Sequence, residues 1–139
     1  MADVKGVNMT TLAGGDVDKL EAGAWGGRVR VRMDSYEAST LAADSTIEVA
    51  KLPKGARVLP QSMVMADALG TGVTLSLGNA GDAEQYLAAV EFNTGGQSKT
   101  LDGIDGICAK LETEETVLIT VGAAAATGTI RSVIFYSLD

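Results

Sequence analysis

The clearest pattern in the chain is a strict alternation of charged and apolar residues in its first third. From Arg28 to Met33 the sequence reads Arg-Val-Arg-Val-Arg-Met. A period of two is that of a β-strand, because successive side chains of a strand point to opposite faces of the sheet. The pattern predicts a strand over 28–33 with its apolar side chains facing a core and its arginines facing outward. The inward residues are Val29, Val31 and Met33, and the outward residues are Arg28, Arg30 and Arg32.

Further segments with strand-like alternation follow along the chain. They are residues 46–51, 57–66, 73–78, 106–111, 116–121 and 129–138. Pro60 interrupts the second of these, which indicates an edge strand or a bulge because proline donates no ladder hydrogen bond. Residues 86–92 fit either a strand or a short helix, because Asp82-Ala-Glu-Gln before them also resembles a helix start. About eight strands separated by glycine-rich turns predict an all-β chain, an antiparallel β-sandwich with a jelly-roll-like arrangement.

Residues 1–26 lack any sustained period and are broken by glycines, which predicts an extended N-terminal arm in front of a β-sandwich domain over 27–139. Within the arm, residues 16–22 are expected to form at most one helical turn, capped by Asp16. Trp25 stands at the junction. We expect its large apolar side chain to pack over one edge of the sheet or into a neighbouring subunit.

The composition refines this picture of the core. Apolar residues make up 46% of the chain but aromatic residues only 4%, so the core is expected to consist of Val, Leu, Ile, Met and Ala. The chain has 17 glycines and two prolines, a ratio that suits tight turns between antiparallel strands. The length of 139 residues fits one domain.

The charge and the single cysteine limit the classes of partner. A net charge of −7 repels a phosphate backbone, so we expect no nucleic-acid partner. No apolar run approaches the roughly 20 residues that span a bilayer, and the first ten residues lack the apolar core of an export signal, so we expect no membrane partner and a soluble chain. Cys108 has no second cysteine to pair with, and its apolar surroundings predict a buried side chain.

The sequence offers little for catalysis. Histidine is absent, which removes the usual general base at neutral pH, the Ser-His-Asp arrangement and the commonest transition-metal ligand. The phosphate-binding P-loop pattern is also missing, and Gly70-Thr-Gly precedes a strand where a dinucleotide site requires a helix. The carboxylates are scattered through turns without an apolar pocket to raise a pKa. We therefore expect neither an enzyme nor a cofactor.

Two acidic segments are candidate sites. The loop Asn79–Glu84 carries three oxygen-bearing side chains and is the one candidate for calcium, but its spacing matches no EF-hand and a solvated turn explains the same residues. Glu112, Glu114 and Glu115 are likewise more typical of a solvated turn. The sequence predicts no metal site.

The three aligned arginines are the most informative charged feature. They repel one another unless acids stand opposite them, either on a neighbouring strand of the same chain or on a partner. Pairing with outward acids such as Glu48 is the favoured interpretation, and a docking stripe for an acidic partner is the alternative. Together with Trp25, the residues Arg28, Arg30 and Arg32 are the candidate partner-binding residues.

Several stretches resemble a family of small virion proteins of tailed bacteriophages. They are Arg-Val-Arg-Val at 28–31 with Asp-Ser-Tyr-Glu-Ala at 34–38, Ala-Lys-Leu-Pro-Lys-Gly-Ala-Arg-Val-Leu at 50–59, the stretch from Gly72 to Leu87, Thr-Val-Leu-Ile-Thr-Val-Gly at 116–122, and Ala-Thr-Gly-Thr-Ile at 126–130. The resemblance covers most of residues 27–139. These stretches are typical of a β-protein framework, and none of them is a motif for a particular chemistry.

The resemblance implies a head decoration, or cement, protein. Such a protein is a β-sandwich homotrimer, made in the host cytoplasm and seated on the capsid surface of the virion, with an N-terminal arm that contacts the major capsid protein. Its role would be to stabilise the head. Two alternatives stay open at this point: another virion component, such as a head fibre base or a neck or tail protein, and a carbohydrate-binding jelly roll for host attachment, which the scarcity of aromatic residues makes less favourable.

Overall fold

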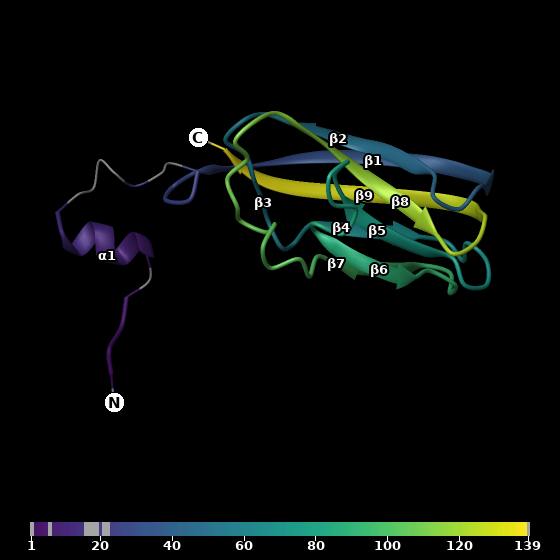
Figure 1. Cartoon of the computed structure of the whole chain (residues 1–139), viewed down its shortest axis with the longest axis horizontal. Coiled ribbons are helices and arrows are strands. Elements are labelled where there is room, and N and C mark those ends of the chain that lie inside the picture. The colour runs from purple at the N-terminus through teal and green to yellow at the C-terminus, as the bar shows by residue number, and fades with distance from the viewer. Residues whose placement is uncertain (1, 6, 16–19, 21–22, 139) are drawn as a thin grey trace.

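The computed structural model describes residues 2–5, 7–15, 20 and 23–138, and nearly all of the regular secondary structure in this part is β. Two antiparallel sheets face each other (Figure 1). The first has the order β1-β9-β4-β7, with the short β3 pairing with β9, and the second has the order β2-β8-β5-β6. The five-stranded sheet consists of β1 (Arg28–Leu41), β3 (Arg57–Val58), β4 (Met63–Ala66), β7 (Gln97–Thr100) and β9 (Ala126–Leu138). The four-stranded sheet consists of β2 (Thr46–Leu52), β5 (Thr74–Gly78), β6 (Leu87–Glu91) and β8 (Glu115–Gly122). The predicted β-sandwich is confirmed.

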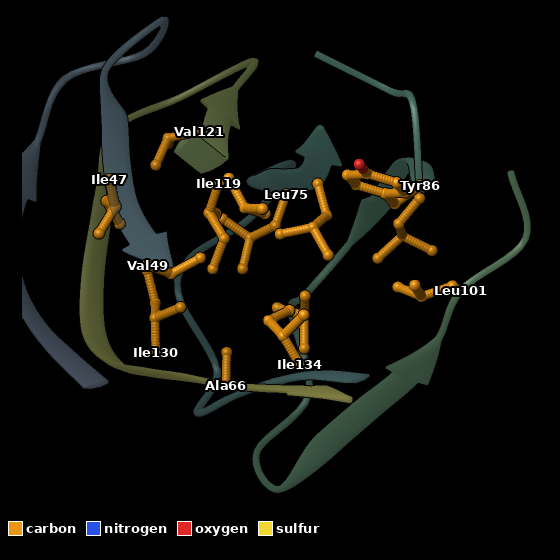
Figure 2. Packing of buried hydrophobic residues seen from close by; sticks show 14 of the residues in the cluster. Ile47, Val49, Ala66, Leu75, Tyr86, Leu101, Ile119, Val121, Ile130 and Ile134 are labelled. Atoms are coloured by element: carbon orange, nitrogen blue, oxygen red, sulfur yellow. The ribbon is translucent and has the colours of Figure 1, made fainter. Parts of the chain in front are cut away.

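The core lies between the two sheets and follows the alternation of the strands. On β9, Ile130, Ile134 and Tyr136 are buried, whereas Val133 and Phe135 between them are only partly buried on the outer face. Ile119 of β8 is fully buried against this layer. Figure 2 shows the side chains of both sheets meeting in one interior. The interior residues drawn and labelled there are Ile47, Val49, Ala66, Leu75, Tyr86, Leu101, Ile119, Val121, Ile130 and Ile134.

Most of the expected strands are present. Ile47 and Val49, the apolar positions in the alternation at 46–51, are buried in β2, and the strand expected over 116–121 is β8. The ambiguous stretch 86–92 is a strand, β6, because its residues pair with β5 from Thr74 opposite Glu91 to Leu77 opposite Leu87.

Three segments differ from the expectation. The stretch 57–66 is divided into β3 and β4 by a turn at Pro60, which follows from the missing donor of proline. Residues 97–100, where no strand was expected, form β7 because β4 offers them a pairing edge. Residues 106–111 are not a strand. Residues 106–108 belong to a turn in which the Ile107 amide donates to the Gly103 carbonyl at 2.9 Å, and Lys110 forms an isolated antiparallel bridge with Arg57.

The expectation that Cys108 is buried is wrong. The residue lies in that turn with a φ of 66°, and its thiol is exposed. Its amide donates to the Val58 carbonyl at 2.7 Å, which fixes the turn against β3. The apolar neighbours in sequence were a poor guide, because Ile107 and Leu111 pack against the core whereas the turn leaves Cys108 between them exposed.

The core consists mainly of Val, Leu, Ile and Ala, as expected, but it also holds aromatic residues and none of the described methionines. The largest fully buried side chains are Tyr86, Tyr136 and Phe92, so three of the six aromatic residues of the chain lie in the core. The methionines of the described residues, in contrast, lie outside the core. Met9 and Met33 are exposed and Met63 and Met65 are partly buried. Part of the apolar content of the chain is therefore on its surface.

One helix precedes the sandwich. The helix α1 (Val7–Ala13) has seven residues, and the sequence pattern did not predict it. Val7 on α1 is 85% exposed, and Figure 1 shows the helix apart from the two sheets. The helical turn expected at Asp16 lies outside the described residues. In the part of the chain that the structure describes, no helix has the length and apolar character needed to cross a membrane.

Candidate interaction surface

The strand β1 forms one edge of the five-stranded sheet. It pairs with β9 in continuous register from Arg28 opposite Leu138 to Ala38 opposite Gly128 (Figure 1). Beyond Ala38 the register shifts at a bulge, where Thr40 has a φ of 50°. No strand of the described residues pairs with the other edge of β1. An edge of this length presents a row of backbone donors and acceptors to any chain that approaches it.

The register with β9 determines which side of β1 faces the core. Arg30 lies opposite Tyr136 and Arg32 lies opposite Ile134. Residues directly opposite each other point to the same face, and both partners on β9 are buried. The arginines are therefore on the core side of the sheet and the apolar residues on its outer side, the reverse of the prediction. The arrangement is tolerated because β1 lies at the open margin of the sandwich, where long arginine side chains reach water.

The arginines do not pair with acids of this chain as expected. Within the described residues no carboxylate lies within ion-pair distance of Arg28, Arg30 or Arg32, and the ion pair found there joins Lys51 to Glu114 at 3.7 Å. Glu48 is not on a strand that pairs with β1, because β2 belongs to the other sheet and places Glu48 opposite Leu118 of β8. The Arg32 guanidinium instead lies 5.1 Å from the centre of the Tyr136 ring. This cation–π contact covers the core at its margin.

The outer side of β1 carries exposed apolar side chains, which we call the apolar strip: Val29, Val31 and Met33. They are 60%, 38% and 71% exposed. The strip continues inward across the sheet, since Val31 is opposite Phe135 and Met33 is opposite Val133, and Val133 is also opposite Met63 of β4. Exposed apolar surface that extends across three strands is typical of a protein interface.

Trp25 lies just before this strand and is 43% exposed. The segment that carries it is attached to the end of β9, because the Ser137 hydroxyl donates a hydrogen bond to the Gly23 carbonyl. Ser137 is in turn opposite Val29 on the outer face. Trp25 therefore lies close to the beginning of β1, where the apolar strip begins. The candidate partner-binding residues thus lie in one region of the molecule.

The loop Asn79–Glu84 uses its oxygens for its own turns. The Asn79 side-chain carbonyl accepts from the amides of Gly81 and Asp82 at 2.9 and 2.8 Å. The Asp82 carboxylate accepts from the Glu84 amide at 3.0 Å. Among the described residues no group of three acidic or sulfur side chains is placed to hold a metal ion. The bonds within the loop favour a structural turn over a ligand site.

Glu115 has a role that the sequence pattern did not reveal. It was expected in a solvated turn, but it is the first residue of β8 and is partly buried. It accepts hydrogen bonds from the Tyr86 hydroxyl and from the Asn79 side-chain amide, the latter at 3.2 Å. Burial of the phenol, followed by the hydrogen bond and the negative charge of Glu115, raises the pKa of Tyr86 far above its usual range. This network ties the 79–86 segment to β8 and is structural.

The known proteins to which this chain is similar are all among the solved structures. No protein-family model and no curated protein matches the sequence. Among solved structures, a chain of the capsid asymmetric unit of cyanophage Pam1 is similar with a TM-score of 0.68 and 30% identity, over 83% of this chain and 88% of that one. A chain of the capsid of Ralstonia phage GP4 has a TM-score of 0.65 and 22% identity, over 81% and 86%. A chain of the acidic stable capsid of Helicobacter pylori bacteriophage KHP30 has a TM-score of 0.56 and 13% identity, over 79% and 87%, and it shares the fold.

Proposed function

We propose that this chain, which belongs to the phage capsid-associated structural proteins, is a decoration protein that binds the lattice of the major capsid protein and stabilises the head. The coarser assignment to the virion rests on the similarity to chains of phage capsids. The observation that carries the finer one is the edge strand β1, which leaves the apolar strip uncovered and three arginines without an acidic partner among the described residues.

The apolar strip and the arginines suit a shell surface for different reasons. Burial of the strip gains roughly 25 cal/mol for each Å² of apolar surface removed from water. The arginines add charge-assisted hydrogen bonds and orient the molecule toward acidic groups of the shell. The whole chain has a net charge of −7, so the three arginines make the beginning of β1 a locally basic feature of an acidic chain, which favours one mode of docking over others.

The N-terminal arm would add a second contact. Residues 1–26 are proposed to reach neighbouring capsid subunits, and the exposed apolar side chains Val4, Val7 and Met9 are the first residues to consider there. A homotrimer, synthesised in the host cytoplasm before it attaches, would present three such arms and three β1 edges. Several weak contacts then combine into strong attachment through multivalency.

Titration of the purified chain onto undecorated heads tests the proposal. Bound chain is measured by co-sedimentation, and head stability is measured by heating and by chelator treatment before and after addition. We expect saturable binding at many lattice positions and an increase in the temperature at which the heads disrupt. Absence of binding, or binding without any gain in head stability, contradicts the decoration role. Occupancy of a single vertex indicates a neck or tail component instead.

Deletion of residues 1–24 tests the arm separately. We expect the remaining chain to fold, because every core residue in the described part of the chain lies beyond this point. It should bind heads more weakly than the full chain. Circular dichroism and co-sedimentation check the two statements, and an unfolded product shows that the arm contributes to the core. Light scattering on both chains determines whether the isolated protein is a trimer.

A further inference from the structure

The free edge of β1 has a sequence that can pair with itself. We propose that this edge pairs antiparallel with the β1 edge of a second copy of the chain, in the register that places Met33 opposite Met33 of the second copy. The contact would join the two five-stranded sheets into one continuous sheet. It goes beyond the binding of a capsid protein, because it connects two copies of this chain.

The geometry of the pairing limits the registers to a short series. Two identical antiparallel strands are related by a two-fold axis, and an axis perpendicular to the sheet keeps the outer face of one copy beside the outer face of the other. The apolar strip of one copy then meets the outer side of the second, and the arginines meet the core-side residues. The registers differ only in which residue of β1 lies on the axis.

The charges of β1 select among these registers. With Val31 on the axis, Arg30 of each copy faces Arg32 of the other, and with Arg32 on the axis this residue faces itself. With Asp34 on the axis, two carboxylates face each other. Like charges directly opposite destabilise a pair of strands, so all three registers are unfavourable.

The register with Met33 on the axis avoids every such clash. Arg32 of each copy then faces Asp34 of the other, which gives two ion pairs, and Arg30 faces Tyr36. A shift of the axis to Ser35 would leave no arginine opposite an acid and would extend the pairing into the bulge that follows Ala38. The alternation of β1 is thus self-complementary in one register.

The exposed side chains of this region gain cover in the same register. Met33, at 71% the most exposed of the apolar strip, would contact its own copy across the axis, and Val31 would lie beside Ser35. Tyr36, which is 39% exposed, would receive the Arg30 guanidinium over its ring. The pairing also explains how a long, flat, partly apolar edge is kept from unspecific strand addition.

A two-fold contact cannot close a trimer by itself. In a trimeric decoration protein it would join copies that belong to two neighbouring trimers. On the head this would link the decoration proteins to one another as well as to the shell. In dilute solution the pairing is expected to be weak, because a single pair of strands buries little surface.

Disulfide formation tests the register directly. In a Cys108→Ser background, which removes the exposed natural thiol, we would place one cysteine by Met33→Cys and expose the concentrated chain to a mild oxidant. Opposed residues of antiparallel strands have Cα atoms about 4.5–5.5 Å apart, within the range that a disulfide spans. The matched control is Val31→Cys on the same face, whose copies would be offset by four residues, about 13 Å. We expect Met33→Cys to form dimers at least about tenfold faster, because paired thiols have a high effective concentration.

Two further variants keep the test decisive. A mixture of Val31→Cys and Ser35→Cys chains should form mixed dimers, whereas neither chain should dimerise alone. Arg32→Asp should slow the linking of Met33→Cys, and the double change Arg32→Asp/Asp34→Arg should restore it. Equal linking rates for Met33→Cys and Val31→Cys in folded protein overturn the proposal, as does a mixed dimer no more frequent than chance. Since the reaction takes place without heads, failure to decorate heads leaves its result unaffected.

Discussion

The stretches 73–77 and 29–33 have the same alternating pattern and opposite surroundings. Val73, Leu75 and Leu77 have no exposed surface, whereas Val29, Val31 and Met33 are 60%, 38% and 71% exposed. β5 pairs with β8 on one side and β6 on the other, and β1 pairs with β9 alone. An alternation of apolar residues therefore predicts a strand, but the register of that strand with its neighbour determines whether the apolar side faces the opposite sheet or the outside.

The largest expected effect on stability is at β5, which has a paired strand on both sides and forms the closed part of the sandwich. Leu75→Ala removes a fully buried side chain and leaves a cavity, so we expect the free energy of unfolding to fall by about 2–5 kcal/mol. Met33→Ala is the matched change in the open part, and it should alter the free energy by less than about 1 kcal/mol. Urea unfolding followed by circular dichroism measures both. Similar losses for the two variants would show that the apolar strip is covered in the isolated protein.

A smaller effect on stability is expected at the hydrogen bond between the Tyr86 hydroxyl and the Glu115 carboxylate. Tyr86→Phe removes the bond to Glu115 and should lower the free energy of unfolding by about 1–2 kcal/mol. Its pH dependence has a defined sign. The unfolded chain ionises this phenol near its ordinary pKa of 10.0, whereas the fold raises the pKa, so the native protein loses stability as the pH rises above that value. Unfolding measured at pH 8 to 11 should show a shallower decline in Tyr86→Phe, and identical slopes contradict the assignment.

The contact between Arg32 and Tyr136, at the edge of the core beside β1, is expected to contribute less to stability. Arg32→Ala removes the guanidinium that lies over the Tyr136 ring and should cost about 0.5–1 kcal/mol. Arg28→Ala, with no ring contact found for it among the described residues, serves as the control and should be nearly neutral. Thermal unfolding of the two variants distinguishes a local contact from a general effect of charge. A larger loss for Arg28→Ala would argue against the contact.

The smallest effect on stability is expected in the apolar strip itself. The double change Val29→Thr/Met33→Gln keeps side chains that strands accept and should alter the free energy of unfolding by less than about 0.5 kcal/mol. Its affinity for undecorated heads should nevertheless fall by about tenfold, which corresponds to roughly 1.4 kcal/mol of binding free energy. Glu48→Gln, on the outer side of the other sheet, is the control for binding. Unchanged affinity in the double variant removes the strip from the binding surface.

Much of the fold could be predicted because the strand period is local. The alternation at 46–51, 73–78 and 129–138 indicated the strands β2, β5 and β9. The apolar residues that share one face in the first two segments are buried: Ile47, Val49, Val73, Leu75 and Leu77. β7 was missed because Gln97–Thr100 has no apolar alternation and depends on β4 for its pairing. The turn at Cys108 was missed because backbone hydrogen bonds, which no side-chain pattern records, hold it in place.

The candidate surface was predicted in part. The sequence indicated Trp25, Arg28, Arg30 and Arg32 as candidates, and in the structure they lie on or next to the edge strand β1. Their role in binding stays a prediction. It assigned the faces of β1 the wrong way round, because it assumed that an apolar side must face the core. The apolar strip emerged only when the register with β9 and the exposure of each side chain were known. A strand order is a property of the whole chain, and no short pattern encodes it.

The most direct test of the account is a cryo-electron-microscopy reconstruction of heads incubated with the chain. The account predicts density at many equivalent lattice positions, with Val29, Val31 and Met33 covered by another protein surface and the arginines of β1 near acidic groups. An outer face of β1 directed into solvent at every position, or density at one vertex alone, would contradict it.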